Sequence, residues 1–253
     1  MKQLFLIFAL ALGTIAQAQL TPVAYKDGGQ KLTGQLARPA SGPSKSGVLI
    51  LPAWKGIDEH AKNTALKLSE LGYYVFIADI YGEGNYPKDN KQAAEKSGLF
   101  KKNFKDYQRR ISLALDQLTR SGANPESIAV IGFCFGGTGA LEAARANLPV
   151  AGVVSFHGNL GRDAKRPTDP IRPKILVCHG ADDPYVPQAE IEAFRNEMKA
   201  SRADWQMVYY SQAVHSFTDT NAGSDPSTGV AYNPRAAERS WEHMRLFLRE
   251  ILR

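Results

Sequence analysis

Short, continuous apolar runs alternate with segments of helical periodicity along most of this chain, and no other feature restricts its fold as strongly. Residues 48–51, 74–78 and 128–131 are apolar throughout, as expected of strands that are buried on both faces. Residues 58–71, between the first two runs, instead place apolar side chains three and four positions apart, which is typical of a helix. This alternation predicts a mostly parallel sheet with helices on both of its faces.

The same reading extends the sheet toward both ends of the chain. Residues 23–25 and 32–37 predict an antiparallel opening pair. Further strands are predicted over 150–156, 175–178 and Trp205–Tyr210, and further helices over 93–118 with a break near Gly98, 136–146, Gln188–Ala200 and 234–252. The segment 218–232 is rich in Gly, Ser, Thr, Asn and Asp and is longer than a plain connection requires, so we interpret it as a lid or specificity loop.

The N-terminal segment has the features of a secretory signal peptide. Lys2 is followed by an apolar run over 4–15 and by the small-residue cleavage pattern Ala16-Gln17-Ala18. We therefore expect cleavage after residue 18, export with retention in a bacterial periplasm, and no stable membrane association afterwards. A buried N-terminal helix or an uncleaved anchor is the alternative to cleavage, and full secretion is the alternative to retention in the periplasm. The remaining residues, 19–253, are enough for a single α/β domain.

Charge and cysteine content narrow the function classes. The net charge of +6 is mild and spread along the chain, and the basic stretches at 101–105 and 109–110 fit the solvated face of a helix, so nucleic acid is not an expected partner. Cys134 and Cys178 would suggest a disulfide in an exported protein, but both end predicted core strands, which argues against one. The spacing of His and Cys predicts no metal site.

The motif that carries chemistry is Gly132-Phe133-Cys134-Phe135-Gly136, which directly follows a predicted strand and opens a helix. This is the context of a nucleophile elbow, with cysteine in place of serine. The glycines two residues away on either side leave room for a sharp turn. The helix N-terminus favours a thiolate at Cys134, and the Phe135 N–H is free to help bind an oxyanion. A buried packing cysteine is the alternative interpretation.

An acid and a histidine follow Cys134 in the order nucleophile, acid, histidine. Asp183 comes just after the strand at 175–178, where it could orient a histidine, and its neighbour Asp182 is the rival candidate. His215 follows the strand Trp205–Tyr210 and is the predicted base. The other histidines have structural interpretations. His60 and His243 lie on predicted helix surfaces, and His157 and His179 end strands and satisfy local hydrogen bonds.

Two further residues are expected beside this site. Trp54 lies in the loop after the strand at 48–51, which by position supplies a second oxyanion N–H, while its indole could wall the pocket or pack as core. Tyr81 shortly follows the strand at 74–78 and is a candidate wall of the substrate pocket.

Taken together, these residues resemble the dienelactone hydrolase family, a cysteine-nucleophile branch of the α/β-hydrolases. The resemblance covers essentially all of residues 19–253. It is carried by four stretches: the elbow extended to Gly137, Ala78-Asp79-Ile80-Tyr81, residues 179–187, and Val214-His215-Ser216-Phe217. The family implies an α/β-hydrolase fold with an eight-stranded mostly parallel sheet, and no metal or organic cofactor. It also implies attack by Cys134, an acyl-thioester intermediate, and hydrolysis of that intermediate by water activated by His215.

The chain departs from the family pattern at three positions. A glutamate that pairs with the thiol aligns with Ala53, and two arginines that hold a substrate carboxylate align with Glu83 and Asp219. Acidic side chains lining the pocket would repel an anionic substrate, so a neutral or cationic ester is expected.

The sequence therefore predicts a hydrolase for a small carboxylic ester or lactone, acting through Cys134, His215 and Asp183. Two alternatives stay open. One is a thioesterase or other acyl-transfer hydrolase, since the elbow is common to many such reactions. The other is a catalytically silent binding or sensing protein that uses an oxidisable thiol. The sequence does not indicate the oligomeric state.

Overall fold

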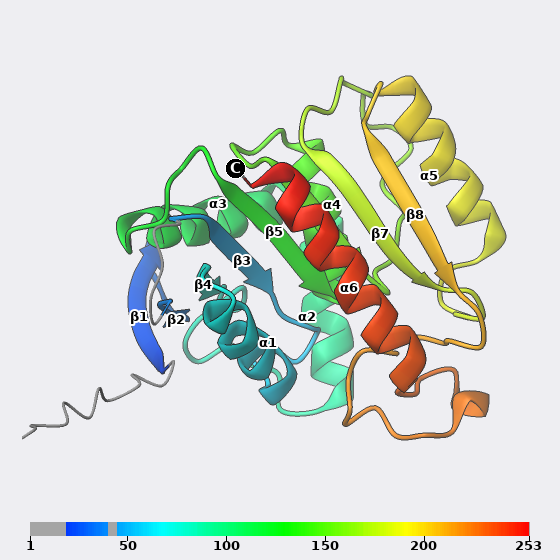
Figure 1. Cartoon of the computed structure of the whole chain (residues 1–253), viewed down its shortest axis with the longest axis horizontal. Helices are drawn as coiled ribbons and strands as arrows, with labels where there is room; N and C mark the ends of the chain where they lie inside the picture. The colour runs from blue at the N-terminus through cyan, green and yellow to red at the C-terminus, as the bar shows by residue number, and fades with distance from the viewer. Residues whose placement is uncertain (1–18, 40–44, 253) are drawn as a thin grey trace, which may run out of the picture.

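A single eight-stranded sheet forms the centre of the computed structural model, which describes residues 19–39 and 45–252 (Figure 1). The strand order is β1-β2-β4-β3-β5-β6-β7-β8. The strands are β1 (Leu20–Asp27), β2 (Gln30–Ala37), β3 (Gly47–Leu51), β4 (Tyr74–Ile77), β5 (Ile128–Phe133), β6 (Gly152–Phe156), β7 (Lys174–Gly180) and β8 (Trp205–Tyr210). Only the β1–β2 and β2–β4 pairs are antiparallel. The predicted α/β-hydrolase sheet is confirmed, and the predicted signal peptide at 1–18 lies outside the described residues.

Helices cover both faces of the sheet. The helices are α1 (Glu59–Glu70), α2 (Asn90–Lys102), α3 (Phe104–Arg120), α4 (Phe135–Arg145), α5 (Gln188–Ala200) and α6 (Pro234–Ile251), with a 3₁₀ helix η1 at Pro226–Thr228. Buried apolar side chains of α3, α4 and α5 pack on one face, and those of α1 and α6 on the other. In Figure 1, α1 and α6 lie in front of the sheet. Each face thus contributes one of two apolar cores.

The predicted helix break near Gly98 is wrong. Helix α2 continues through Gly98 to Lys102, and the chain leaves helical geometry at Asn103, which has φ −96° and ψ 59°. A helical glycine costs only about 1 kcal/mol relative to alanine, so packing of the surrounding residues readily overrides it. Helix α3 then begins at Phe104 and buries Tyr107 and Ile111 against the sheet.

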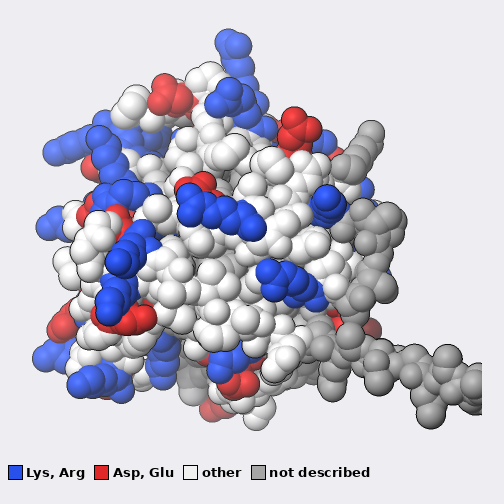
Figure 2. Space-filling view, turned by 90° about the vertical axis from the view of Figure 1, so that its left-hand side faces the viewer, with Lys and Arg blue, Asp and Glu red and all other residues white. Residues whose placement is uncertain are grey.

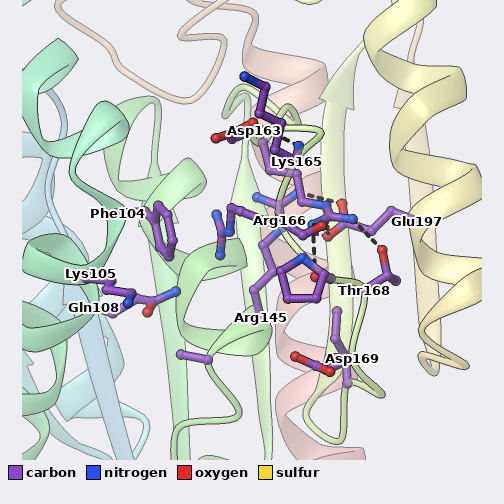
Figure 3. Close-up of a pocket in the computed structure, with 14 residues that line it drawn as sticks. Phe104, Lys105, Gln108, Arg145, Asp163, Lys165, Arg166, Thr168, Asp169 and Glu197 are labelled. Carbon is purple, nitrogen blue, oxygen red and sulfur yellow. Dashed lines mark hydrogen bonds and ion pairs between the residues drawn. The ribbon is translucent and has the colours of Figure 1, made fainter.

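Buried ion pairs fasten helix α4 to helix α5 and to the segment before β7 (Figure 3). Arg145 on α4 bonds both Glu142, one turn earlier, and Glu197 on α5. Arg166 makes two hydrogen bonds to Glu142 and stacks over the Phe104 ring at 3.6 Å. Burial alone would raise the pKa of Glu142, but Arg166 and Arg145 outweigh it and lower that pKa below its usual value. The network therefore ties α4 to its neighbours by charge as well as by apolar packing.

The charged surface in Figure 2 is mixed. Lys and Arg side chains are spread over this face with Asp and Glu among them, and an uncharged area occupies its centre. Within the described residues, no helix is long and apolar enough to cross a membrane.

Candidate active site

The six strands β4, β3, β5, β6, β7 and β8 run parallel to one another and end at the same edge of the sheet. Functional side chains of open parallel sheets gather at this edge because every following loop emerges there. The loops after β5, β7 and β8 carry Cys134, Asp183 and His215 respectively. Residues that are far apart in sequence therefore meet at one place.

Cys134 occupies a sharp turn between β5 and α4. Its backbone has φ 53° and ψ −114°, a region that side-chain-bearing residues rarely adopt. The flanking glycines make the turn possible: a Cβ at Gly132 would lie 1.9 Å from the Gly136 carbonyl oxygen, and one at Gly136 would lie 2.0 Å from the Leu51 carbonyl oxygen. No other residue type fits either position, so the motif is required by close backbone packing.

The structure brings the three predicted catalytic side chains together. The Cys134 Sγ lies 3.0 Å from His215 Nε2, and His215 Nδ1 lies 2.9 Å from Asp183 Oδ2. The Asp183 side chain is fully buried, and its other oxygen, Oδ1, accepts a hydrogen bond from the Tyr185 N–H. The rival acid, Asp182, is exposed. Asp183 is therefore the acid that contacts the imidazole.

The electrostatics of this arrangement favour an imidazolium. Burial by itself would lower the pKa of His215, but hydrogen bonds to Asp183 and Cys134, together with their negative charges, raise it to about 10. A histidine that stays protonated beside a thiol stabilises the thiolate form, which is the nucleophilic form of cysteine.

Backbone hydrogen bonds hold His215 in place. Its N–H donates to the Gly229 carbonyl, and its own carbonyl accepts from the Ala231 N–H, which makes a parallel bridge between His215 and Val230. The segment 218–232, interpreted above as a lid or specificity loop, therefore returns to support the histidine. Deleting it would disturb His215, so its part in specificity calls for single substitutions.

The predicted oxyanion donors lie on the two loops that flank the thiol. Phe135 is the first residue of α4, so its N–H has no partner within the helix. Trp54 follows β3, is half-buried, and its carbonyl accepts a 2.6 Å hydrogen bond from the Tyr81 hydroxyl. This bond fixes the Trp54 loop against Tyr81.

Tyr81 belongs to a cluster of aromatic rings beside Cys134. Its ring stacks parallel to Phe135 with centroids 6.0 Å apart, and Phe100 from α2 packs against both at 5.9 Å and 6.4 Å. Burial, reinforced by the nearby Cys134, raises the pKa of Tyr81 well above its usual value. Phe100 was not among the sequence candidates, because its neighbours in sequence show only a surface helix.

The two acidic residues expected in the pocket have separate surroundings. The Glu83 carboxylate accepts a hydrogen bond from the Thr33 hydroxyl, and the Glu83 backbone pairs with Lys31 on β2. Asp219 lies beside Asp58 and His60 near the start of α1. Glu83 is thus held against β2, whereas Asp219 lies at the start of α1, and their place in the substrate pocket stays a prediction.

A cation at this edge was missed by the sequence reasoning. Lys101, near the end of α2, donates to the Asn159 side chain at 2.9 Å, and Asn159 in turn donates to the Tyr185 carbonyl. The Tyr185 ring packs edge-on against His215 with centroids 5.3 Å apart. No local signal marked Lys101, since it stands within a run of helical surface lysines.

Three of the other histidines also surround the site. His157 Nδ1 accepts the Cys134 N–H at 3.2 Å, and His157 Nε2 lies 2.8 Å from the Thr218 hydroxyl. His60, predicted on a helix surface, is instead half-buried and lies 3.2 Å from the same hydroxyl, because the first turn of α1 packs beneath the Thr218 loop. His179 is buried, which lowers its pKa. His243 remains exposed and bonds Tyr210.

Neither of the two cavities that flank the helices includes the Cys134–His215–Asp183 group. The cavity of Figure 3, about 440 Å³, lies over α4 and is lined by the ion-paired Arg145, Arg166 and Glu197. The other, about 420 Å³, lies between α1 and α6, and His60 and Thr218 form part of its wall.

Cys134 and Cys178 are both free thiols, and the described residues contain no cluster of three or more His, Cys, Asp or Glu that could hold a metal.

Comparison with known proteins places this chain in a family. The family model of the dienelactone hydrolase family matches residues 32–252. The chain belongs to the dienelactone hydrolase family. It is accordingly a carboxylic ester hydrolase of the dienelactone hydrolase type, which confirms the resemblance drawn from the elbow and the histidine motif.

Individual relatives of this dienelactone hydrolase family member differ in their named activities. The Probable 2-oxo-3-(5-oxofuran-2-ylidene)propanoate lactonase of Bradyrhizobium sp is 26% identical over 87% of this chain and 90% of its own length. A dienelactone hydrolase-like promiscuous phosphotriesterase from metagenomic libraries is 34% identical, covers 94% of this chain and 100% of its own, and superimposes with a TM-score of 0.88. The dienelactone hydrolase of Anabaena variabilis, 19% identical over 94% of this chain and all of its own, shares the fold with a TM-score of 0.66.

Proposed function

We propose that Cys134, His215 and Asp183 form a catalytic triad that hydrolyses a small carboxylic ester or lactone through an acyl-thioester intermediate. The observation that carries this proposal is the continuous hydrogen-bonded line from the Cys134 Sγ through the buried His215 ring to Asp183, with contacts of 3.0 Å and 2.9 Å. A nucleophile, a base and an orienting acid at these separations meet the geometric requirement for covalent catalysis.

The reaction has two halves. In the first, the Cys134 thiolate attacks the carbonyl carbon, the N–H groups of Phe135 and Trp54 stabilise the oxyanion, and the His215 imidazolium gives its proton to the departing alkoxide. In the second, neutral His215 takes a proton from water, the hydroxide attacks the thioester, and the Cys134 thiolate leaves as the carboxylic acid forms. Loss of one oxyanion donor typically raises the barrier by about 2.7–4 kcal/mol.

The aromatic rings beside the thiol support an uncharged, apolar portion of the substrate. Phe100 and Trp54 are half-buried and pack against the apolar core on the α3–α4 face of the sheet. The charged groups around this edge are of both signs, with Lys101 on one side and Asp219 on the other. We therefore propose a neutral ester or lactone as the preferred substrate. Phosphotriesters are a second candidate class, favoured by the activity named for the 34% identical relative.

Hydrolysis of a panel of neutral, anionic and cationic p-nitrophenyl esters, lactones and one phosphotriester tests the proposal. We expect turnover of neutral esters by residues 19–253, abolished in Cys134→Ala and retained in Cys178→Ala, the matched control at the buried second cysteine. Mass spectrometry of His215→Ala should reveal an acyl group on Cys134. Turnover that survives Cys134→Ala would refute the thiol mechanism. A chain that turns over no substrate, while peroxide oxidises Cys134, would instead support a sensing protein.

The signal-peptide features support export, and we propose that the functional protein begins at Gln19 in the periplasm. N-terminal sequencing of the protein recovered from a periplasmic extract tests this. A protein that retains Met1 in the cytoplasmic fraction would contradict it.

A further inference from the structure

His157 sits between the two loops that carry Cys134 and His215. Strands β6 and β7 lie between β5 and β8, so β5 and β8 are roughly 14 Å apart at the usual strand spacing. His157 follows β6, and its ring packs edge-on against both His215 and Phe217, with centroids 5.4 Å and 5.2 Å away. It therefore contacts both the nucleophile loop and the base loop.

Both ring nitrogens of His157 have partners, one on each loop. Nδ1 accepts a hydrogen bond from the Cys134 N–H at 3.2 Å, and Nε2 lies 2.8 Å from the hydroxyl of Thr218, three residues after His215. Because a backbone N–H can only donate, Nδ1 must be unprotonated, and the neutral ring therefore carries its proton on Nε2 and donates to Thr218. The Thr218 hydroxyl is then free to donate to His60 Nε2, 3.2 Å away.

The result is a directed chain of hydrogen bonds from Cys134 through His157 and Thr218 to His60 on α1. It requires a neutral His157, and the surroundings favour that state. Burial lowers the pKa of His157 well below its usual value, and positive charge on His215, His60 or His179 would lower it further.

Strained backbone gathers along the same chain. Six non-glycine residues among those described have positive φ, and three of them are Cys134 at 53°, His157 at 40° and Ser216 at 58°. Such conformations are strained and persist only where surrounding bonds enforce them. The Cys134 turn is enforced from outside its own loop by two acceptors for one N–H, His157 Nδ1 and the Phe156 carbonyl at 3.0 Å.

We propose that His157 is a positioning residue that sets the Cys134–His215 contact by bonding both loops at once, with Thr218 and His60 completing the chain. This inference rests on the proposed role of Cys134 as nucleophile. Without His157, Cys134 keeps its Phe156 bond but the Thr218 loop loses its link to the elbow. The 3.0 Å contact between Sγ and Nε2 then lengthens, and the thiol is no longer held beside the His215 ring.

Four variants separate the two bonds. His157→Phe keeps the ring and removes both nitrogens. His157→Asn places an amide oxygen where Nδ1 lies and suits the positive φ, so it retains an acceptor for Cys134 alone. His157→Gln reaches toward Thr218 alone. Thr218→Val removes only the hydroxyl. His243→Phe, at an exposed histidine that bonds Tyr210, is the matched control.

The readout is the rate of Cys134 alkylation by iodoacetamide between pH 5 and 10, followed by mass spectrometry, together with kcat and KM for p-nitrophenyl acetate and the unfolding midpoint. We expect His157→Phe to lose about tenfold to a hundredfold in kcat with KM little changed, since a misplacement of about 1 Å has effects of this size. Its alkylation should be slower than that of wild type, because the His215 ring no longer lies against the thiol. His157→Asn should recover part of the loss, Thr218→Val should lie between, and His243→Phe should match wild type.

A folded His157→Phe protein with the wild-type alkylation profile would overturn the inference, as would a variant that loses stability alone. If His157→Phe does not fold, the same criteria apply to His157→Asn and Thr218→Val. Wild-type protein whose Cys134 reacts slowly at every pH and turns over no ester would overturn the proposed function itself, which distinguishes that failure from this one.

Discussion

Replacing Asp183 with asparagine tests the electrostatic basis of the site with a change of one atom. Asp183 Oδ1 accepts the Tyr185 N–H at 2.9 Å, so the amide oxygen of an asparagine must stay on that side. The amide NH₂ then faces His215 Nδ1, which can only accept from it. His215 is forced to carry its proton on Nε2, where it can no longer take one from the Cys134 thiol.

The size of the effect follows from the pKa of His215. Burial opposes its charge, while bonds to Asp183 and Cys134 raise that pKa from 6.5 to about 10. The whole interval corresponds to at most about 5 kcal/mol, or roughly 10³-fold in the ratio of imidazolium to neutral imidazole. Loss of the correct tautomer in a related triad costs about 10⁴-fold in kcat. We therefore expect Asp183→Asn to lose on the order of 10³–10⁴ in kcat.

The assay is p-nitrophenyl acetate hydrolysis at pH 7, with Cys134 alkylation as a readout that needs no particular substrate. Asp182→Asn is the matched control, because Asp182 is exposed and adjacent, and it should retain wild-type activity. If Asp183→Asn and Asp182→Asn behaved alike, or if Asp182→Asn were the inactive variant, the assignment of the acid and the role of its charge would both be wrong.

Three further predictions concern stability. The pKa of His215 is raised in the folded chain, so its charge stabilises the fold fully below about pH 6.5. In urea unfolding, the difference in unfolding free energy between wild type and His215→Gln should therefore shrink as pH rises through about 10. A difference that stays constant with pH would contradict the ion pair. Gly132→Ala should destabilise the fold by about 3 kcal/mol or more, because its Cβ would lie 1.9 Å from a carbonyl oxygen. Gly98→Ala, whose Cβ would meet nothing within 4 Å, should stabilise the fold by about 0.5–1 kcal/mol. Similar midpoints of the two variants in thermal unfolding would refute the packing argument. Glu142→Gln should cost about 3–5 kcal/mol, since two buried arginines lose a charge partner, and an unchanged urea midpoint would show that the network contributes nothing.

Local sequence determined much of this protein. Apolar runs such as 128–131 suit central strands that are buried on both faces, and a glycine two residues on either side of Cys134 is what a sharp strand-to-helix turn requires. These features depend on neighbours within a few residues, so they can be read without a structure. Cys134, Asp183 and His215 were assigned from the chain order expected of an α/β-hydrolase, and their loops meet because parallel strands end at one edge of the sheet.

Tertiary structure alone decided what surrounds that line of residues. His157, Thr218 and His60 form one hydrogen-bonded chain. Thr218 and His60 lie 158 residues apart in the sequence, and no sequence pattern connects the three residues. Glu83 turned to β2, and Lys101 reached Asn159, because side-chain partners are chosen by packing after the loops have met. Sequence periodicity specifies which face of an element is buried, but the neighbours of a polar side chain at a loop edge are set by the three-dimensional arrangement of the whole sheet.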